Sequence, residues 1–248
     1  MKKQAITLVL LAALAISPGC KKVFDYIDQH PDEDHTDCQI TEMKFNDKSR
    51  MVFSYNKDGN PDSITSYPGN YLRNLAFRYD KKKRLVESWD YFENGIANRW
   101  SRYQYNNKGQ IISDSTWDQG VFVNGHWELT GFETLILKKY VYDEKGRITD
   151  IFMYSPGEST PFDQQEFDYD ERGNLHNYGS QSPAAAYDSK MSFYRTHKVF
   201  MFYFGNYSLN NPAGATAYNS NYLPTAFSGG NYFFGGDLAG GTISYKCK

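Results

Sequence analysis

The chain has 248 residues, and its 27 Lys and Arg against 29 Asp and Glu leave a net charge of −2 at pH 7. Such a balance lacks the basic surface that nucleic acids require, so we expect no nucleic-acid partner. With 21 Tyr, 17 Phe and 4 Trp, the composition excludes a coiled coil, a helical bundle and a disordered chain. It predicts an all-β, mainly antiparallel fold.

The first 19 residues have the order of an export signal. Lys2 and Lys3 precede an apolar run over 5–16, which is too short to span a bilayer, and the small or turn-forming residues 17–19 lead directly to Cys20. This arrangement resembles the lipobox of bacterial lipoproteins. The resemblance implies cleavage before Cys20 and its acylation, which would hold the chain at the outer membrane, on its periplasmic or cell-surface face. An ordinary signal peptide with Cys20 as a simple thiol is the alternative.

One pattern then recurs along the chain: aromatic, any residue, Tyr, Asp or Asn, two polar residues, Gly, a polar residue and an apolar one. The key tyrosines of the five good copies and of a degenerate sixth are Tyr55, Tyr79, Tyr105, Tyr142, Tyr169 and Tyr218.

The pattern predicts a β-hairpin. The two aromatics of each copy share one face of a strand, and the Asp or Asn begins a type I turn. We expect the glycine of each turn to adopt the left-handed conformation that closes it; these residues are Gly59, Gly109, Gly146 and Gly173. Lys83 and Tyr222 replace that Gly in two copies, so those turns should be strained or of another type. We also expect each key tyrosine to stack across on the return strand.

The copies resemble tyrosine-aspartate (YD, or Rhs-type) repeats, and the whole chain resembles bacterial lipoproteins of unknown function built from a lipobox, several such repeats and an aromatic tail. Successive hairpins should form one curved or twisted sheet. The longest spacing between copies marks an insertion, in which Asn124-Gly125 between apolar alternations predicts a further two-residue hairpin.

After residue 175 the composition changes, with only 7 charged residues among the last 73. The apolar run 199–204 is a buried strand or part of a short helix, and 242–245 reads as a closing strand. We therefore divide the chain into a signal peptide (1–19), an acidic lipid-anchored tether (20–38), the repeat region (39–178) and an aromatic, Gly-rich cap (179–248). The cap should cover the open edge of the last hairpin.

The sequence carries no pattern typical of catalysis. The five histidines lack metal-ligand spacing, and the chain contains no Cys-x-x-Cys, Gly-x-Ser-x-Gly or phosphate-loop motif, so we expect no enzyme, metal or cofactor. Four tryptophans, which either contact a sugar or serve as core and cross-strand partners, are Trp89, Trp100, Trp117 and Trp127.

These features favour a membrane-anchored, non-catalytic binding or interaction module for a glycan or a protein of the envelope. The alternative is a structural lipoprotein that scaffolds an envelope assembly. With Cys20 acylated, Cys38 and Cys247 remain as an even pair in an exported chain. They form a disulfide if the two ends of the fold meet, and stay unpaired thiols if an open stack of hairpins keeps the ends apart.

Overall fold

The computed structural model describes residues 37–67, 73–92, 97–124, 126–128, 134–178, 186–229, 232–233 and 236–248. The expected signal peptide, Cys20 and nearly all of the tether lie outside these residues. Within them, no helix has the length and apolar character needed to cross a membrane.

The elements, in chain order, are β1 (Cys38–Lys44), β2 (Arg50–Tyr55), β3 (Pro61–Tyr67), β4 (Asn74–Tyr79), β5 (Leu85–Tyr91), β6 (Ala97–Tyr105), β7 (Ile111–Asp118), β8 (Val121–Val123), β9 (His126–Glu128), β10 (Thr134–Tyr142), β11 (Ile148–Tyr154), β12 (Asp163–Tyr169), β13 (Leu175–Tyr178), β14 (Tyr187–Met191), the 3₁₀ helix η1 (Phe193–Thr196), α2 (Lys198–Tyr203), β15 (Asn210–Pro212), β16 (Ala215–Tyr218), β17 (Pro224–Phe227), β18 (Tyr232–Phe233), β19 (Gly236–Asp237) and β20 (Thr242–Cys247).

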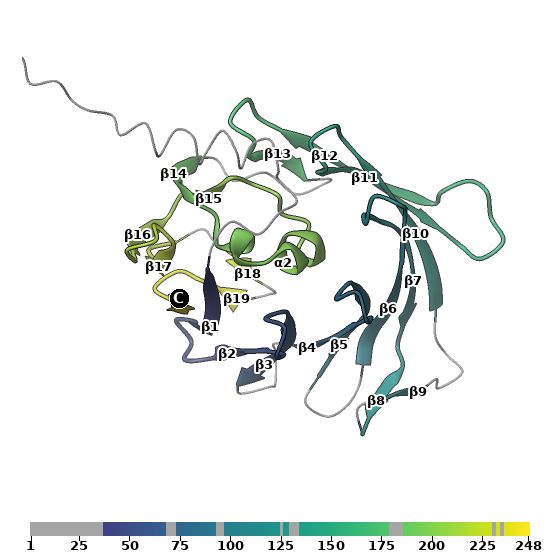
Figure 1. The fold of residues 1–248 in the computed structure, drawn as a ribbon, viewed down its shortest axis with the longest axis horizontal. Helices are drawn as coiled ribbons and strands as arrows, with labels where there is room; N and C mark the ends of the chain where they lie inside the picture. The colour runs from purple at the N-terminus through teal and green to yellow at the C-terminus, as the bar shows by residue number, and fades with distance from the viewer. Residues whose placement is uncertain are drawn as a thin grey trace, which may run out of the picture.

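Fourteen of the strands form one antiparallel sheet, in the order β13-β12-β11-β10-β7-β6-β5-β4-β3-β2-β1-β20-β17-β16. The sheet curves around α2 without closing, as Figure 1 shows. The helical segments of the described chain, η1 and α2, have only four and six residues. The all-β prediction with serial hairpins in one curved sheet is therefore confirmed. The predicted insertion hairpin is confirmed too, because β8 pairs with β9 and Val123 lies opposite His126.

The Tyr-Asp turns lie along one rim of the sheet, which we call the turn side; the longer connections lie on the opposite rim, the loop side. The turn after Tyr142 shows how the motif works. The Asp143 carboxylate accepts the backbone N–H groups of Lys145 and Arg147, both at 2.9 Å, and Gly146 at φ 79° donates to the Asp143 carbonyl. The predicted left-handed glycines have φ between 79° and 83°.

The two turns that lack glycine keep the same geometry under strain. Lys83 and Tyr222 have φ of 63° and 61°, and each donates its N–H to the carbonyl that begins its turn. A left-handed conformation costs a residue with a Cβ about 1 kcal/mol or more. A similar turn over 45–49, with Lys48 at φ 70°, joins β1 to β2 on the loop side. That turn could not be recognised in the sequence, because residues 45–49 contain neither the Tyr nor the Gly of the motif.

The key tyrosines of the five good copies bond to earlier strands, which differs from the stacking we expected within one hairpin. The sixth, Tyr218, donates instead to the Asp188 carboxylate at 2.7 Å. Tyr105 donates its hydroxyl to the Leu85 carbonyl of the preceding hairpin at 2.7 Å, while the Arg84 guanidinium lies 4.7 Å from its ring centroid. Asp80 in turn holds Arg84 at 2.8 Å. Equivalent hydroxyl-to-carbonyl bonds of 2.6 to 3.0 Å link Tyr55, Tyr79, Tyr142, Tyr169, Tyr187 and Tyr245 to earlier strands.

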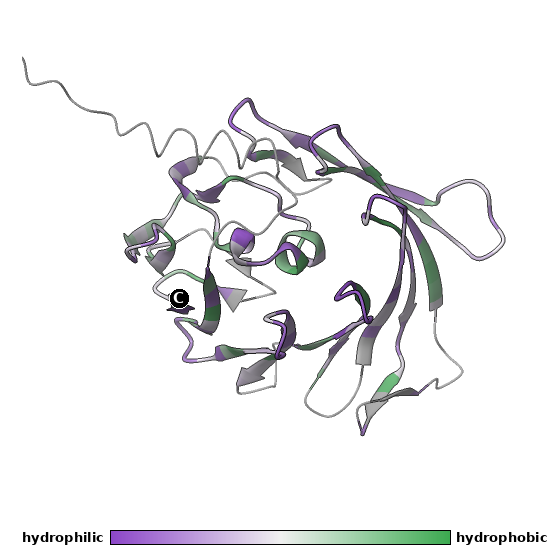
Figure 2. Cartoon of the chain, viewed as in Figure 1, coloured by the Kyte–Doolittle hydropathy of each residue, from purple (hydrophilic) through white to green (hydrophobic). Residues whose placement is uncertain are grey.

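The C-terminal segment contacts both edges of the sheet. At β13, the edge that we expected it to cover, the Leu175 N–H donates to Ser208 Oγ at 3.0 Å. In addition, its strands extend the opposite edge, which we did not expect, where β20 pairs with β1 and β17 with β20. The run 199–204 is largely helical, and α2 lies on the concave side of the sheet (Figure 1). Figure 2 shows that α2 is strongly apolar. Its Phe200 packs edge-to-face on Phe53 with centroids 5.7 Å apart, which explains why this segment turns inward.

The pairing of β1 with β20 brings the two ends of the fold together. Cys38 lies directly opposite Cys247, their Cα atoms are 4.0 Å apart, and the structure joins them in a disulfide. The bridge spans 209 residues of sequence. The terminal strands therefore meet as neighbours, and the alternative of an open stack with distant ends does not describe this fold.

Candidate functional site: two cavities in the concave face

The concave face of the sheet holds two cavities separated by one aromatic ring. The turn-side cavity has a volume of about 450 Å³ and the loop-side cavity about 350 Å³. Phe202 of α2 lines both, and its ring packs 5.4 Å from that of Tyr103 and 5.3 Å from that of Tyr140. Both volumes fall in the range of small-ligand sites.

Carboxylates reach the loop-side cavity because side chains alternate across a strand. Asp90 of β5 and Asp114 of β7 are 1% and 3% exposed, and both line the cavity. Asp114 accepts hydrogen bonds from Tyr140 and, at 2.7 Å, from Thr116. Arg73 pairs with Asp90 at 2.9 Å. Buried carboxylates are costly unless they are paired, and these contacts explain how the chain tolerates them.

Lys138 of β10 is the least satisfied charge in this cavity. It faces Asp114 in the β10–β7 register, yet within the described part of the chain its ammonium makes no hydrogen bond or ion pair. Burial lowers the pKa of Lys138, because the charged form loses hydration. Gln165 also lines this cavity, and its amide makes no hydrogen bond to the described residues. Both groups can donate to a ligand oxygen.

Tyrosines supply the aromatic surface of the loop-side cavity. Burial raises the pKa of Tyr103, Tyr140 and Tyr203, so their hydroxyls stay protonated at neutral pH. Tyr103 and Ser88 share a hydrogen bond of 2.6 Å. The cavity therefore combines carboxylate acceptors, cationic and amide donors, hydroxyls and ring faces. This combination suits a ligand that carries many hydroxyl groups.

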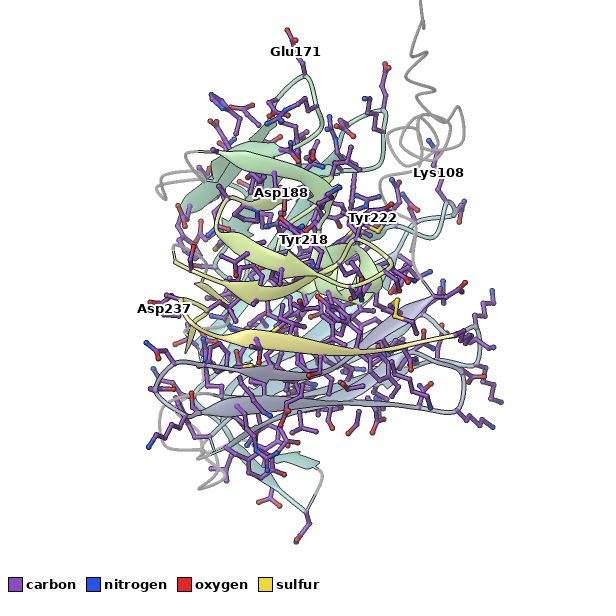
Figure 3. The ribbon with its side chains drawn as sticks, turned by 90° about the vertical axis from the view of Figure 1, so that its left-hand side faces the viewer. Lys108, Glu171, Asp188, Tyr218, Tyr222 and Asp237 are labelled. Carbon is purple, nitrogen blue, oxygen red and sulfur yellow. A yellow bond between two sulfur atoms is a disulfide. The ribbon has the colours of Figure 1, made fainter. Side chains whose placement is uncertain are left out.

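The turn-side cavity has a different lining. Its charged lining residues are Lys83, Arg84, Lys108 and Lys198, and no carboxylate stands among its described lining residues. Figure 3 shows Lys108 near one edge of the molecule and Asp237 near the opposite edge. The ring walls come from key tyrosines such as Tyr79, whose hydroxyl already donates to the Pro61 carbonyl at 2.8 Å.

The three tryptophans whose side chains are described line neither cavity. Trp89, Trp100 and Trp117 lie opposite one another in register across β5, β6 and β7. Their sequence neighbours Ser88, Ser101 and Thr116 point into the concave face, so alternation puts the three indoles on the convex face. Trp100 and Trp117 stack with centroids 4.7 Å apart, which is the cross-strand role we gave as the alternative to sugar contact. The side chain of Trp127 lies outside the described residues.

The other predicted residues divide between the cavities and the frame. Gly109 and Gly146 line the turn-side cavity, whereas Gly59 and Gly173 serve in turns outside it. Cys38 and Cys247 lie in the frame, and Cys20 is outside the described residues. Across the described chain, no three His, Cys, Asp or Glu side chains form a group able to hold a metal ion.

Sequence reasoning missed the aromatic residues that matter most for the cavities. Tyr103 and Tyr140 occupy the first aromatic position of their copies, where Phe53, Phe77 and Phe167 stand in the other three. A hydroxyl at a position that otherwise buries a phenyl ring signals a polar partner inside. The replacement of Phe by Tyr in these two copies was therefore the signal in the sequence that could have indicated the cavity residues. Nothing local in the sequence, by contrast, places Phe202 opposite these two rings.

No protein-family model matches the chain, and no curated protein matches it. Solved structures similar to it include TcdB2-TccC3-Cdc42 (16% identity, TM-score 0.33, covering 55% of this chain and 7% of that one) and TcdB2-TccC3 without its hypervariable C-terminal region (15%, 0.31, 77% and 9%). A Photorhabdus luminescens Tc holotoxin pore carrying a TccC3 mutation gives 15%, 0.33, 75% and 9%. The chain spans less than a tenth of each, and these likenesses carry no argument about function.

Proposed function

We propose that this protein is a non-catalytic binding module that holds a saccharide in the loop-side cavity. The observation that carries the proposal is the lining of that cavity, where buried carboxylates and an unpaired half-buried ammonium lie beside tyrosine rings and hydroxyls. Sugars present hydroxyls that both donate and accept, together with apolar ring faces. Asp114 offers an acceptor, Lys138 a donor, and Tyr203 and Phe202 flat aromatic surface.

The test measures saccharide binding to the detergent-solubilised full chain, first on a glycan array and then by calorimetry with the sugars retained. Lys138→Met and Asp114→Asn should each weaken binding about tenfold, because a hydrogen bond to a charged group contributes roughly 1.5–3 kcal/mol. Lys139→Met is the matched control, since Lys139 is adjacent on β10 and contacts Tyr154 on the opposite face. Equal losses in Lys138→Met and Lys139→Met, or no saccharide bound at all, would contradict the proposal.

The export proposal has its own test. The order of residues 2 to 20 supports delivery to the outer membrane and acylation of Cys20. Cys20→Ala should release the protein into the soluble fraction or leave its signal uncleaved, whereas unchanged membrane retention would remove the lipoprotein assignment. Two or more acyl chains give stable anchoring, so the effect should be nearly complete.

The scaffold alternative draws on the convex face. There the half-buried stacked pair Trp100 and Trp117 continues the row begun by Trp89, and Leu135 extends that row onto β10. An aromatic row of this kind suits burial against a protein partner. A pull-down from solubilised membranes distinguishes the two functions: Trp117→Ala should abolish capture of an envelope protein if the scaffold role holds, and leave saccharide binding unchanged.

A further inference from the structure

The turn-side cavity contains hydrogen-bond donors that no described residue accepts from. Asn60 is only 9% exposed and lines the cavity, yet its amide nitrogen Nδ2 has no hydrogen-bond partner among the described residues. Leaving a buried donor unsatisfied costs about 1–3 kcal/mol. The Asn60 backbone makes the turn contacts that the hairpin needs, so the side-chain amide is not required for the turn itself. A buried, unused donor in a cavity wall points to a ligand acceptor.

Two more donors lie in the same wall. Gln110 accepts from Asn106 through Oε1 at 3.0 Å, which leaves its Nε2 hydrogens unused within the described chain. Lys108 contributes an ammonium with no ion pair to any described residue. Charged acceptors are lacking, because the described lining residues include no carboxylate; the key tyrosines there donate their hydroxyls to backbone carbonyls and keep only weak, neutral acceptor oxygens.

The neighbouring charges add to this donor excess. Arg84 is held by Asp80 and Lys83 by Asp58 at 3.0 Å, so these two cations are locally balanced. Lys108 makes no ion pair with any described residue. The cavity therefore presents positive charge and N–H groups, and an anionic oxygen group would satisfy both.

The shape of the site limits the ligand to an extended one. Asn60, Arg84, Gln110 and Gly146 belong to four successive turns, and neighbouring hairpins repeat every two strands, about 10 Å apart. Tyrosine rings such as Tyr105 lie between those turns. We infer that the turn-side cavity binds an acidic oligosaccharide, with its carboxylate or sulfate groups on Asn60, Gln110 and Lys108 and its sugar rings against the tyrosines. This inference does not rest on the loop-side proposal, because it uses different residues.

The experiment titrates the detergent-solubilised full chain with an oligogalacturonate hexamer, a sulfated hexasaccharide and neutral maltohexaose. At least one acidic probe should bind, more weakly as NaCl is raised, and maltohexaose should not compete. Asn60→Ala and Lys108→Gln should each reduce that affinity roughly tenfold. The acidic probe that binds identifies carboxylate or sulfate as the group recognised.

Lys145→Gln is the matched control, because Lys145 holds the same turn position in the next copy but does not line the cavity. It should change the affinity less than twofold. Asn60→Ala removes an amide nitrogen that bonds no described residue, so its unfolding midpoint should be no lower than that of the parent chain. The inference is overturned if neither acidic probe binds, if maltohexaose competes equally, or if Lys145→Gln weakens binding as much as Lys108→Gln. Loss of the loop-side site through Lys138→Met should leave acidic binding intact.

Discussion

The two cavities share one sheet and one aromatic divider, yet their linings differ in kind. The loop-side cavity mixes carboxylates, cations and hydroxyls, whereas the charged groups of the turn-side lining are all cations. The difference follows from where the lining originates. Most turn-side residues come from the repeated motif, which supplies Lys, Arg and Gly in its turns, while loop-side residues such as Asp114 and Lys138 stand at strand positions that the motif does not specify. The repeats therefore build the frame and most of the turn-side lining, and the variable strand positions determine the chemistry of the loop-side cavity.

The largest expected effect comes from the disulfide in the sheet that encloses both cavities. The disulfide between Cys38 and Cys247 closes the pairing of β1 with β20 over a separation of 209 residues. Removing it through a double Cys38→Ala, Cys247→Ala variant should cost about 4 kcal/mol of unfolding free energy, since the unfolded chain regains its freedom. Urea unfolding measures the loss. Dithiothreitol should destabilise the parent chain equally and leave the double variant unchanged; a parent chain indifferent to reductant would show that the thiols are unpaired.

Phe202→Ala tests whether the cavities are separate compartments. The ring packs on Tyr103 and Tyr140, so its loss should cost about 3 kcal/mol through lost contacts and the space left behind. The two cavities should also join, which would make ligands of the two sites compete where they were independent. Chemical unfolding and competition calorimetry measure these effects. Phe162→Ala is the control, because Phe162 is 58% exposed and its truncation should cost less than about 0.5 kcal/mol.

Acid should weaken the helix that carries the divider. Burial, with a smaller contribution from Lys198, lowers the pKa of His197 to about 3. In the unfolded chain the imidazole binds a proton near pH 6.5, so below that pH the unfolded state holds a proton that the folded state lacks. Stability should therefore fall as the pH falls from about 6.5 towards 3, with a loss of about 2 kcal/mol by pH 5.

Urea midpoints at pH 7 and pH 5 check this expectation. His197→Asn keeps an acceptor for the Val199 N–H that caps α2, and it should flatten the pH dependence. If His197→Asn and the parent chain lose the same stability on acidification, another group is responsible.

The smallest effect concerns the rim of the turn-side cavity. Lys83 is left-handed at φ 63°, so Lys83→Gly should stabilise the fold by about 1 kcal/mol, less the small contribution of its exposed pair with Asp58. Gly109→Ala should do the reverse by a similar amount, because Gly109 has φ 83° and a Cβ there would meet no atom within 4 Å. Thermal melts of both variants give the comparison, and changes of the same sign would refute the strain argument.

Much of the frame could be predicted from the sequence, because it depends on local rules. Alternating aromatics, the turn-forming Asp143 and left-handed Gly146 specify a hairpin wherever they occur, and five copies specify a row of hairpins. The edge chosen by β20 could not be predicted, since strand pairing between distant segments leaves no local pattern. The cavities could not be predicted either, because each is lined by residues from four or more elements that meet only in the folded chain.

The sequence by itself determined the hairpins, their turn chemistry and the insertion loop at Asn124, since each depends on residues within ten positions of one another. Only the tertiary structure decided that the sheet curves round α2, that Cys38 meets Cys247, and that Phe202 divides the space inside. The physical reason is that curvature accumulates over fourteen strands from small twists and bulges. The segment that the curved sheet encloses, α2, is then the distant apolar segment that packs best on its concave face.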